Sequence, residues 1–413
     1  MATPPPYLRL YTHALESIFS HLNLLELARI SATCRNWSAA VNSMRPIGVL
    51  VGRSRHLDLD SMCASRLMRH VYMLDIHLKY VSDLPTLCDI IKKSKSLVAL
   101  DLSKNRIDAF DVSAVAEAIN QSKSSLCTLD LNHNLIGAAG ASAVAEVIKQ
   151  STSLTKVDLS NNSIGAVGAS AIAEAIKQSK SLCTVNLRSN AIKAVGITDI
   201  AEAIKQSKSL VAVDLSWNSI GLVGAEAIAE TIKQSNSLTT VGLSGNWIGD
   251  VGIFAVSEAI KQSRSLATVD LSYNAIGDVG VFSIAEAIKQ SKSLALAAVN
   301  LNYNSVGNVG AAALADSIKQ SNSMTTVALR DNQIGAVGAS ALAEAIKQSK
   351  SLTAVDLSCN DIGFTGASAI IEAIKQSKSP LTTLDLSFNH MDAIEKSAIA
   401  EAIKKIESIV VKC

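Results

Sequence analysis

Residues 154–181, LTKVDLSNNSIGAVGASAIAEAIKQSKS, recur with small changes from Leu97 onward in a chain of 413 residues. One asparagine marks each copy, and seven of the ten spacings between successive copies are 28 residues. A fixed period of this length is typical of a stacked array in which each repeat is one structural unit. The eleven marking residues are Asn105, Asn134, Asn162, Asn190, Asn218, Asn246, Asn274, Asn304, Asn332, Asn360 and Asn389.

Each repeat contains one predicted strand and one predicted helix. Val157 and Leu159 alternate with polar residues, so their side chains leave a short strand on the same side. The strand ends at Asn162, whose side chain can bond backbone groups of neighbouring turns, and we predict a ladder of these asparagines inside the bend. Apolar residues at helical spacing follow, and they predict a helix: Ala169, Ile172, Ala173 and Ile176.

The pattern LxxLxLxxN, the Ile-Gly after the asparagine and a helix such as AIAEAIKQS resemble the leucine-rich repeat of the ribonuclease-inhibitor type. The resemblance covers eleven repeats, residues 97–413, or about three quarters of the chain. It implies an α/β fold: a horseshoe-shaped solenoid with parallel strands on the concave side and helices on the convex side. A single coil cannot bury its apolar face alone, so stability is shared between neighbouring coils.

The bulk composition gives no reason to expect nucleic acid, a membrane or a metal as a partner. Basic residues number 38 against 36 acidic ones, a net charge of +2, and no apolar run approaches the roughly 18 residues of a membrane span. The first residues lack the apolar core of a secretory signal, so we expect a cytoplasmic chain, also compatible with the nucleus. Seven cysteines without a CxxC pair favour free thiols.

Residues 10–45 form a separate predicted helical segment after a Pro-rich start at residues 1–9. The run Ile18-Phe19-Ser20-His21-Leu22, then Leu27 and Cys34-Arg35-Asn36-Trp37, resembles an F-box. That resemblance implies docking onto a Skp1-type adaptor of a cullin-RING ubiquitin ligase. The implied docking residues are Leu10, Leu15, Ile18, Phe19, Leu22, Leu27 and Trp37. The alternative is a helical cap that shields the first coil.

The flanks of the array are less regular than its centre. Residues 46–96 contain degenerate repeats, and Met73 to Ile76 are the last predicted strand before the first clear coil. Where inner coils carry glycine, the first coil has Asp108 and Asp111 and the last has Asp392 and Glu395. Acidic residues at these places are expected to cap the helix starts. A short closing strand is expected near Val410.

Three sets of equivalent positions, which we call columns, can be compared between the repeats. A helix acid is followed three residues later by lysine in ten of eleven coils, which predicts solvent-exposed pairs. Aspartate follows the central strand residue in seven coils. We interpret this column mainly as repeat background; the alternatives are attraction of a basic ligand and, least favoured, acid-base catalysis by paired carboxylates. The residue before each ladder asparagine varies freely, and aromatics concentrate in the middle coils. A cluster of this kind is typical of a protein-binding hot spot, although buried filler is the alternative. The predicted partner-binding residues are Trp217, Trp247, Phe254, Tyr273, Phe282, Tyr303, Arg188 and Arg330.

The sequence therefore predicts a protein-interaction module without catalytic residues or a cofactor, because it has no P-loop, dinucleotide fingerprint or nucleophile beside a base. The first hypothesis is the substrate-recognition subunit of a Skp1-cullin-F-box-type ubiquitin ligase, a monomer outside its complex, whose repeats bind an unidentified target protein. The alternative is a plain binding or inhibitor scaffold, and a GTPase-activator-like regulator is weaker because the last residues are basic and apolar rather than acidic.

Overall fold

A computed structural model describes residues 73–75, 84–291, 296–377, 380–404 and 409–412. The expectations for residues 1–72, including every F-box-like position, lie outside this part of the chain. The chain divides into two compact units, residues 1–186 and residues 187–413, and each is described by itself.

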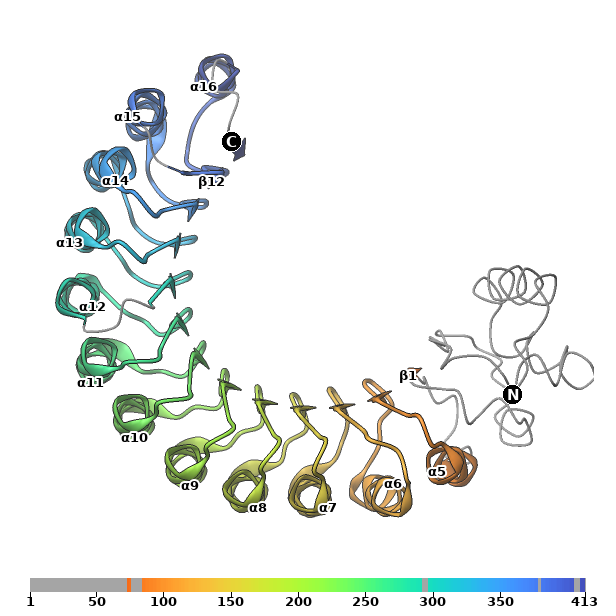
Figure 1. The fold of residues 1–413 in the computed structure, drawn as a ribbon. Helices are drawn as coiled ribbons and strands as arrows, with labels where there is room; N and C mark the ends of the chain where they lie inside the picture. Colours follow the sequence, from red (N-terminus) through yellow and green to blue (C-terminus); the bar gives the residue numbers. More distant parts are fainter. Residues whose placement is uncertain (1–72, 76–83, 292–295, 378–379, 405–408, 413) are drawn as a thin grey trace, which may run out of the picture. The chain divides into compact units, whose positions relative to one another are not determined.

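The first unit alternates strands and helices, and its strands pair in parallel with equivalent residues in register. The strands lie in one layer and the helices in another (Figure 1). The elements are β1 (Met73–Asp75), α5 (Leu84–Lys93), β2 (Ala99–Asp101), α6 (Ala109–Gln121), β3 (Thr128–Asp130), α7 (Gly137–Gln150), β4 (Lys156–Asp158), α8 (Gly165–Gln178) and β5 (Thr184–Asn186).

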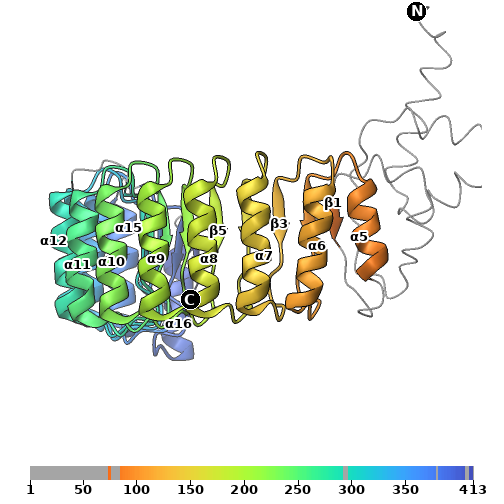
Figure 2. The same cartoon turned by 90° about the horizontal axis from the view of Figure 1, so that it is seen from below.

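The second unit shows the same alternation, and the eight strands among its described residues are parallel and in chain order. Its strands line the inner side of an arc, and its helices stand side by side on the outer side (Figures 1 and 2). The helices are α9 (Lys193–Gln206), α10 (Gly221–Gln234), α11 (Gly249–Gln262), α12 (Asp278–Gln290), α13 (Asn308–Gln320), α14 (Ala336–Gln348), α15 (Gly363–Gln376) and α16 (Ala393–Ile403). The strands are β6 (Ala212–Asp214), β7 (Thr240–Gly242), β8 (Thr268–Asp270), β9 (Ala298–Asn300), β10 (Thr326–Ala328), β11 (Ala354–Asp356), β12 (Thr383–Asp385) and β13 (Val410–Lys412).

The predicted repeat solenoid of parallel strands and helices is confirmed. Each coil buries the strand and helix residues that the periodicity selected, such as Val157, Leu159 and Ile172, which are fully buried. The expected strands before the first clear coil and near Val410 are present as β1 and β13. Helices approach closely at Gly168, where an added Cβ would lie 3.0 Å from the Cβ atom of Ala141 in the preceding helix.

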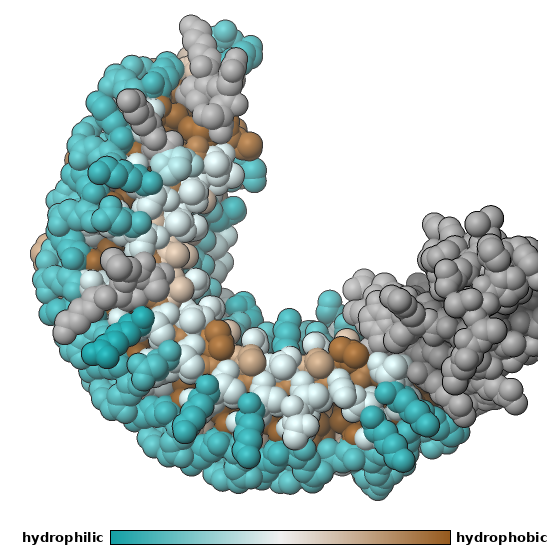
Figure 3. All heavy atoms as spheres, in the orientation of Figure 1, coloured by the Kyte–Doolittle hydropathy of each residue, from teal (hydrophilic) through white to brown (hydrophobic). Residues whose placement is uncertain are grey.

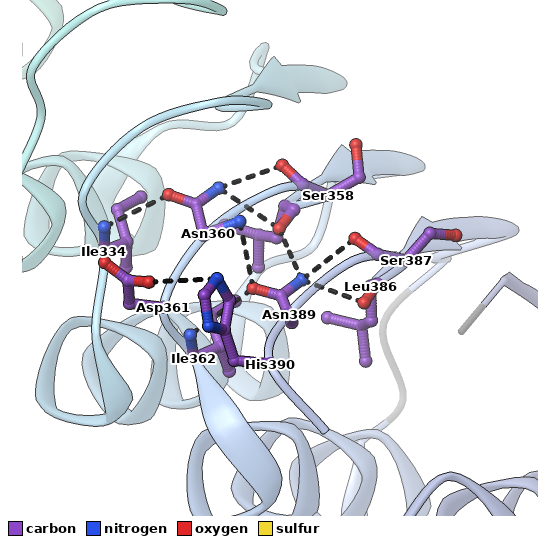
Figure 4. Close-up of polar contacts among 10 residues, drawn as sticks. Ile334, Ser358, Asn360, Asp361, Ile362, Leu386, Ser387, Asn389 and His390 are labelled. Carbon is purple, nitrogen blue, oxygen red and sulfur yellow. Dashed lines mark hydrogen bonds and ion pairs between the residues drawn. The ribbon is translucent and has the colours of Figure 1, made fainter. Parts of the chain in front are cut away.

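The asparagine ladder is also confirmed. The Nδ2 atom of Asn246 donates to the carbonyl oxygens of Leu215, Leu243 and Ser244 at 3.0 to 3.2 Å, and its Oδ1 accepts from the amide of Asn218 at 2.8 Å. Figure 4 shows two further rungs, Asn360 and Asn389. Since these side chains are buried, they satisfy backbone groups that water does not reach.

The outer helix surface carries the predicted acid–lysine pairs. In the described residues, nine such pairs lie at 2.7 to 3.7 Å, from Glu146–Lys149 to Glu401–Lys404. Figure 3 shows hydrophilic residues along the helix side of the second unit. Exposed pairs at this spacing are screened by solvent and contribute little to stability, so they form a solvated surface and not a site.

Capping of the helices follows two different rules. In the first and last clear coils, Asp108 with Asp111 and Asp392 with Glu395 form capping boxes, as predicted. Three inner helices are instead capped by the preceding coil, which the sequence patterns did not predict. Asp250 Oδ1 accepts from the amides of Gly277 and Gly280 at 2.8 and 3.1 Å, at the start of α12. Asp278 and Asn308 do the same for α13 and α14.

These caps change the local backbone of the coil that receives them. The residue equivalent to Asp250 is Ala, Leu or Phe in the other eight coils. Gly277, which receives the cap, has an extended backbone at φ −99°, whereas the equivalent Gly249 is left-handed at φ +61°. A carboxylate or amide oxygen at a helix start stabilises it by about 1 kcal/mol.

Candidate functional site

The residue before each ladder asparagine has a left-handed backbone in every repeat. Ten of these residues are not glycine and have φ between 54° and 60°. Such a conformation costs an L-residue about 1 kcal/mol relative to glycine, and bulky residues rarely adopt it. The scaffold therefore fixes the backbone of this column while leaving its side chain free to vary. Large aromatic side chains kept at such positions favour a role in contact.

Three of these aromatic side chains lie against one another. The ring centroids of Trp217 and Tyr273 are 5.3 Å apart at a tilt of 51°, and Tyr273 stacks on Tyr303 at 4.1 Å and 11°. We call these three residues the aromatic row. Trp217 and Tyr273 keep 41% and 43% of their surface exposed, and Tyr303 is half-buried. The filler alternative is therefore disfavoured for all three.

An arginine stands at each end of the aromatic row. The guanidinium carbon of Arg188 lies 5.7 Å from the ring centroid of Trp217, and that of Arg330 lies 5.9 Å from the centroid of Tyr303. The Nε atom of Arg330 also donates to the Tyr303 hydroxyl at 3.0 Å. Cation–π contacts restrict both long side chains, and the hydrogen bond restricts Arg330 further, so the row and its arginines form one continuous surface in the second unit.

The electrostatics of the row keep its groups in fixed charge states near neutral pH. The hydrogen bond with Tyr303 raises the pKa of the Arg330 guanidinium above its ordinary value. Burial raises the pKa of the Tyr273 phenol, and the neighbouring Tyr303 hydroxyl adds to this shift. Tyr273 is therefore neutral and Arg330 is positively charged near neutral pH.

Gly245 allows the row to be continuous. It occupies the left-handed column between Trp217 and Tyr273, with φ +65°, and a Cβ built on it would lie 2.6 Å from Cδ2 of Trp217. The indole therefore lies across the backbone of the Gly245 coil and reaches Tyr273 two coils away. The sequence pattern contained this glycine, but its role was visible only from the position of the indole.

Replacing Gly245 by alanine is expected to displace Trp217 from Tyr273. The new methyl group would overlap the indole, and the left-handed backbone adds about 1 kcal/mol of strain. We expect weaker target binding, a modest loss of stability and an altered tryptophan fluorescence spectrum, measured on the purified chain. Gly249→Ala is the matched control, because Gly249 is also left-handed and a methyl group added there would have no atom within 4 Å. Equal fluorescence changes in the two variants would contradict this explanation.

The other three predicted aromatics do not join the row by ring contacts in the part of the chain that the structure describes. Trp247, Phe254 and Phe282 are exposed by 77%, 50% and 55%. Phe254 and Phe282 occupy equivalent positions on α11 and α12, three residues after the exposed Val251 and Val279. The predicted cluster of six therefore divides into the aromatic row and a separate apolar helix edge.

This helix edge includes a column of exposed valines that was not among the predicted site residues. Each valine lies five residues after its ladder asparagine, so a column-by-column comparison of the repeats could have found it. Its members in the second unit are Val195, Val223, Val251, Val279, Val309 and Val337.

The aspartate column on the strands behaves as a row of like charges. In the first unit, Asp130 on β3 is in register with Asp101 on β2 and Asp158 on β4. Burial raises the pKa of Asp130 from its ordinary value to about 6, and the charges of Asp158 and Asp101 add to the shift. The neighbouring carboxylates therefore repel one another, and Asn186 relieves this repulsion at the next strand by donating to Asp158 at 2.8 Å.

Replacing Asp130 by asparagine is expected to stabilise the protein near pH 7.5 and to have no such effect near pH 3. A raised carboxyl pKa means that the folded state disfavours the ionised form; the penalty is absent below the unfolded pKa and complete above about 6. Because Asp130 is only half-buried, we expect a gain of about 1 kcal/mol in the free energy of unfolding, measured by urea denaturation. Asp385→Asn is the control, since Asp385 lies 3.9 Å from Lys412 and should gain nothing. A pH-independent gain for Asp130→Asn would contradict the argument.

Neither a metal site nor a membrane span is present among the described residues. No group of three His, Cys, Asp or Glu residues in this part of the chain is arranged to hold a metal ion. No described helix is long and apolar enough to cross a membrane.

Comparisons with known proteins agree with the repeat geometry. The leucine-rich-repeat family matches nine segments of the chain: 122–145, 150–173, 206–229, 234–257, 262–285, 296–315, 320–343, 348–370 and 377–393. The chain is thus a leucine-rich-repeat protein, a class of protein-interaction module. The F-box domain family matches residues 8–47. The chain therefore belongs to the F-box/leucine-rich-repeat proteins.

Two solved structures that match the chain are distant from it in sequence. An internalin (inlF) from Listeria monocytogenes is 14% identical, with a TM-score of 0.47, and the match covers 91% of this chain and 92% of that one. The leiomodin-1 actin-binding site 2 is 21% identical, with a TM-score of 0.30, and the match covers 32% of this chain and 77% of that one. Comparison with curated protein sequences returned no match.

Proposed function

We propose that this chain is the target-recognition subunit of a Skp1-cullin-F-box-type ubiquitin ligase. Residues 8–47 dock onto a Skp1-type adaptor, the repeats hold the target protein, and other subunits transfer ubiquitin. The observation that carries this proposal is the presence of an F-box match and a repeat array in one chain. The chain itself performs no catalysis; it raises the effective concentration of the target near the transfer machinery.

The aromatic row is the proposed centre of the target-binding surface. Tryptophan, tyrosine and arginine dominate protein-binding hot spots, and here all three lie in contact. The rings are held by stacking and the arginines by the rings, so little side-chain freedom remains to be lost on binding. Trp247, Phe254 and Phe282 extend the proposed surface along the helix edge.

Adaptor docking is tested with the full-length chain and a purified Skp1-type adaptor. Leu22→Ala and Trp37→Ala remove large apolar side chains from the F-box-like pattern, and each should lower the amount of co-purified adaptor at least tenfold. Trp247→Ala is the control, because it makes the same kind of change within the repeats. Thermal unfolding of all variants shows whether the array remains folded.

The outcome separates the two functions that the sequence left open. Loss of the adaptor in Leu22→Ala and Trp37→Ala, but not in Trp247→Ala, supports a ligase subunit. If the wild-type chain does not bind the adaptor, the ligase proposal is wrong, and a plain binding scaffold with an N-terminal cap remains.

A further inference from the structure

The side chains on the surface between Arg188 and Arg330 differ in charge and size in a way that favours one class of target segment. Both arginines belong to a column that otherwise contains only serine and asparagine: Ser103, Asn132, Ser160, Ser216, Ser244, Ser272, Asn302, Ser358 and Ser387. They stand one repeat before Trp217 and one repeat after Tyr303. Arg188 and Arg330 are therefore the only two arginines of this column, and they mark the two ends of the aromatic row.

Apart from the column that holds Asp214, Asp270 and Asn300, the strand face beside the aromatic row carries only small side chains. The outward residues that precede the buried strand valines are Ala212, Thr240, Thr268 and Ala298, all half-buried. Gly242 and the buried Ser216, Ser244 and Ser272 continue this low surface toward the row. An extended chain can therefore lie along the face with its side chains against the aromatic rings.

The length of this surface matches a short extended segment. Five repeat-to-repeat steps of about 4.8 Å separate the two arginine positions, or about 24 Å. An extended chain rises about 3.3 Å per residue, so about seven residues span the distance.

The ends of the surface are positively charged and favour acidic groups, whereas its middle is negatively charged and repels them. The Nε atom of Arg330 is bound to the Tyr303 hydroxyl, and the guanidinium carries further N–H groups of a geometry that suits a carboxylate. Asp214 and Asp270 lie on the strands between the arginines and accept from the amides of Ser216 and Ser272 at 2.9 and 3.0 Å. An acidic residue above these two carboxylates would be repelled.

We propose that the surface binds an extended segment of about seven residues in the target, with an acidic residue at each end and neutral, mainly apolar residues between them. The end carboxylates pair with Arg188 and Arg330, and the central residues pack on Trp217, Tyr273 and Tyr303. This inference rests on the proposed function, because it describes the target of the same site.

The test uses the full-length chain and two fluorescein-labelled peptide pools of seven residues each. One pool has glutamate at both ends and the other has lysine, and in both the five central positions are drawn from Ala, Val, Leu and Pro. Fluorescence anisotropy should show at least tenfold tighter binding of the glutamate pool. Binding of neither pool, or equal binding of both, overturns the proposal.

Variants of Arg330 assign the preference to this surface. Arg330→Gln should weaken binding of the glutamate pool about tenfold. Arg330→Glu should abolish the preference for the glutamate pool, because Arg188 still favours glutamate at one end while the new carboxylate favours lysine at the other. Arg264→Gln, a change at an exposed arginine outside the surface, should have no effect. Equal behaviour of Arg330→Gln and Arg264→Gln overturns the proposal. If Arg330→Gln lowers the unfolding midpoint, Tyr303→Phe decides: it keeps the guanidinium and the ring, removes only the hydroxyl, and should weaken binding about threefold.

The proposed site and the acidic pattern fail in different ways. If Trp217→Ala with Tyr273→Ala abolishes target capture while the lysine pool binds as well as the glutamate pool, the site stands and the acidic pattern is wrong. If that double variant captures the target normally, the aromatic row is not the site.

Discussion

Replacing Asn246 by alanine should lower the free energy of unfolding by about 3 kcal/mol, a large effect for a single substitution. The side chain makes four hydrogen bonds to the backbone of two coils, its own and the preceding one, and it is fully buried. Alanine leaves three carbonyl groups and one amide without these partners in a place that water does not reach. Urea denaturation followed by far-ultraviolet circular dichroism measures the change.

Asn236→Ala is the matched control for the ladder. Asn236 is exposed in the loop after α10, and its loss should change the free energy of unfolding by less than about 0.5 kcal/mol. A similar effect of both substitutions would show that the ladder does not hold the coils together. Since stability in repeat arrays is shared between neighbours, Asn246→Ala should also broaden the transition by uncoupling the coils on its two sides.

The double substitution Trp217→Ala with Tyr273→Ala should weaken target binding at least 30-fold while leaving thermal unfolding nearly unchanged. Both rings are more than two-fifths exposed, so they lie outside the fully buried strand-and-helix core that holds the coils together. Their contact with each other and with Tyr303 would be lost, and with it the flat apolar surface. Binding to a target identified by affinity purification with the wild-type chain measures the effect.

Phe388→Ala provides the control for this double variant. Phe388 occupies the same column in the last repeat, with φ +58° and 72% exposure, and it lies outside the aromatic row. It should not weaken target binding. A large drop in the unfolding temperature of Trp217→Ala with Tyr273→Ala would show that the rings are core and not contact surface.

Most of the repeat architecture was predictable because each coil depends on local patterns that recur many times. The alternation around Val157 and Leu159 identified the strand, the spacing from Ala169 to Ile176 identified the helix, and the asparagine column identified the ladder. The acidic residues at Asp108 and Asp392 correctly indicated capping boxes, since such a cap needs only residues within one turn.

Features that connect different coils were not predictable in the same way. The cap that Asp250 provides to α12 spans 27 and 30 residues, and no local rule links an aspartate to a helix start at that separation. The exposed valine column was also present in the sequence. A valine near a helix start is usually buried in the core, so only the positions of the surrounding side chains show that these valines are exposed.

The residues of the candidate site could be predicted from the sequence, but which of them contact one another could not. The sequence by itself determined that aromatic and arginine residues depart from the repeat pattern in the middle coils, because internal repeats show which positions the scaffold fixes. Only the tertiary structure decided that Trp217, Tyr273 and Tyr303 touch while Trp247, Phe254 and Phe282 lie apart, because side-chain direction depends on the left-handed backbone and on the space above Gly245. The repeated pattern determines the strand, bend and helix of each coil. The contacts between coils depend on side chains that come together only when the coils stack.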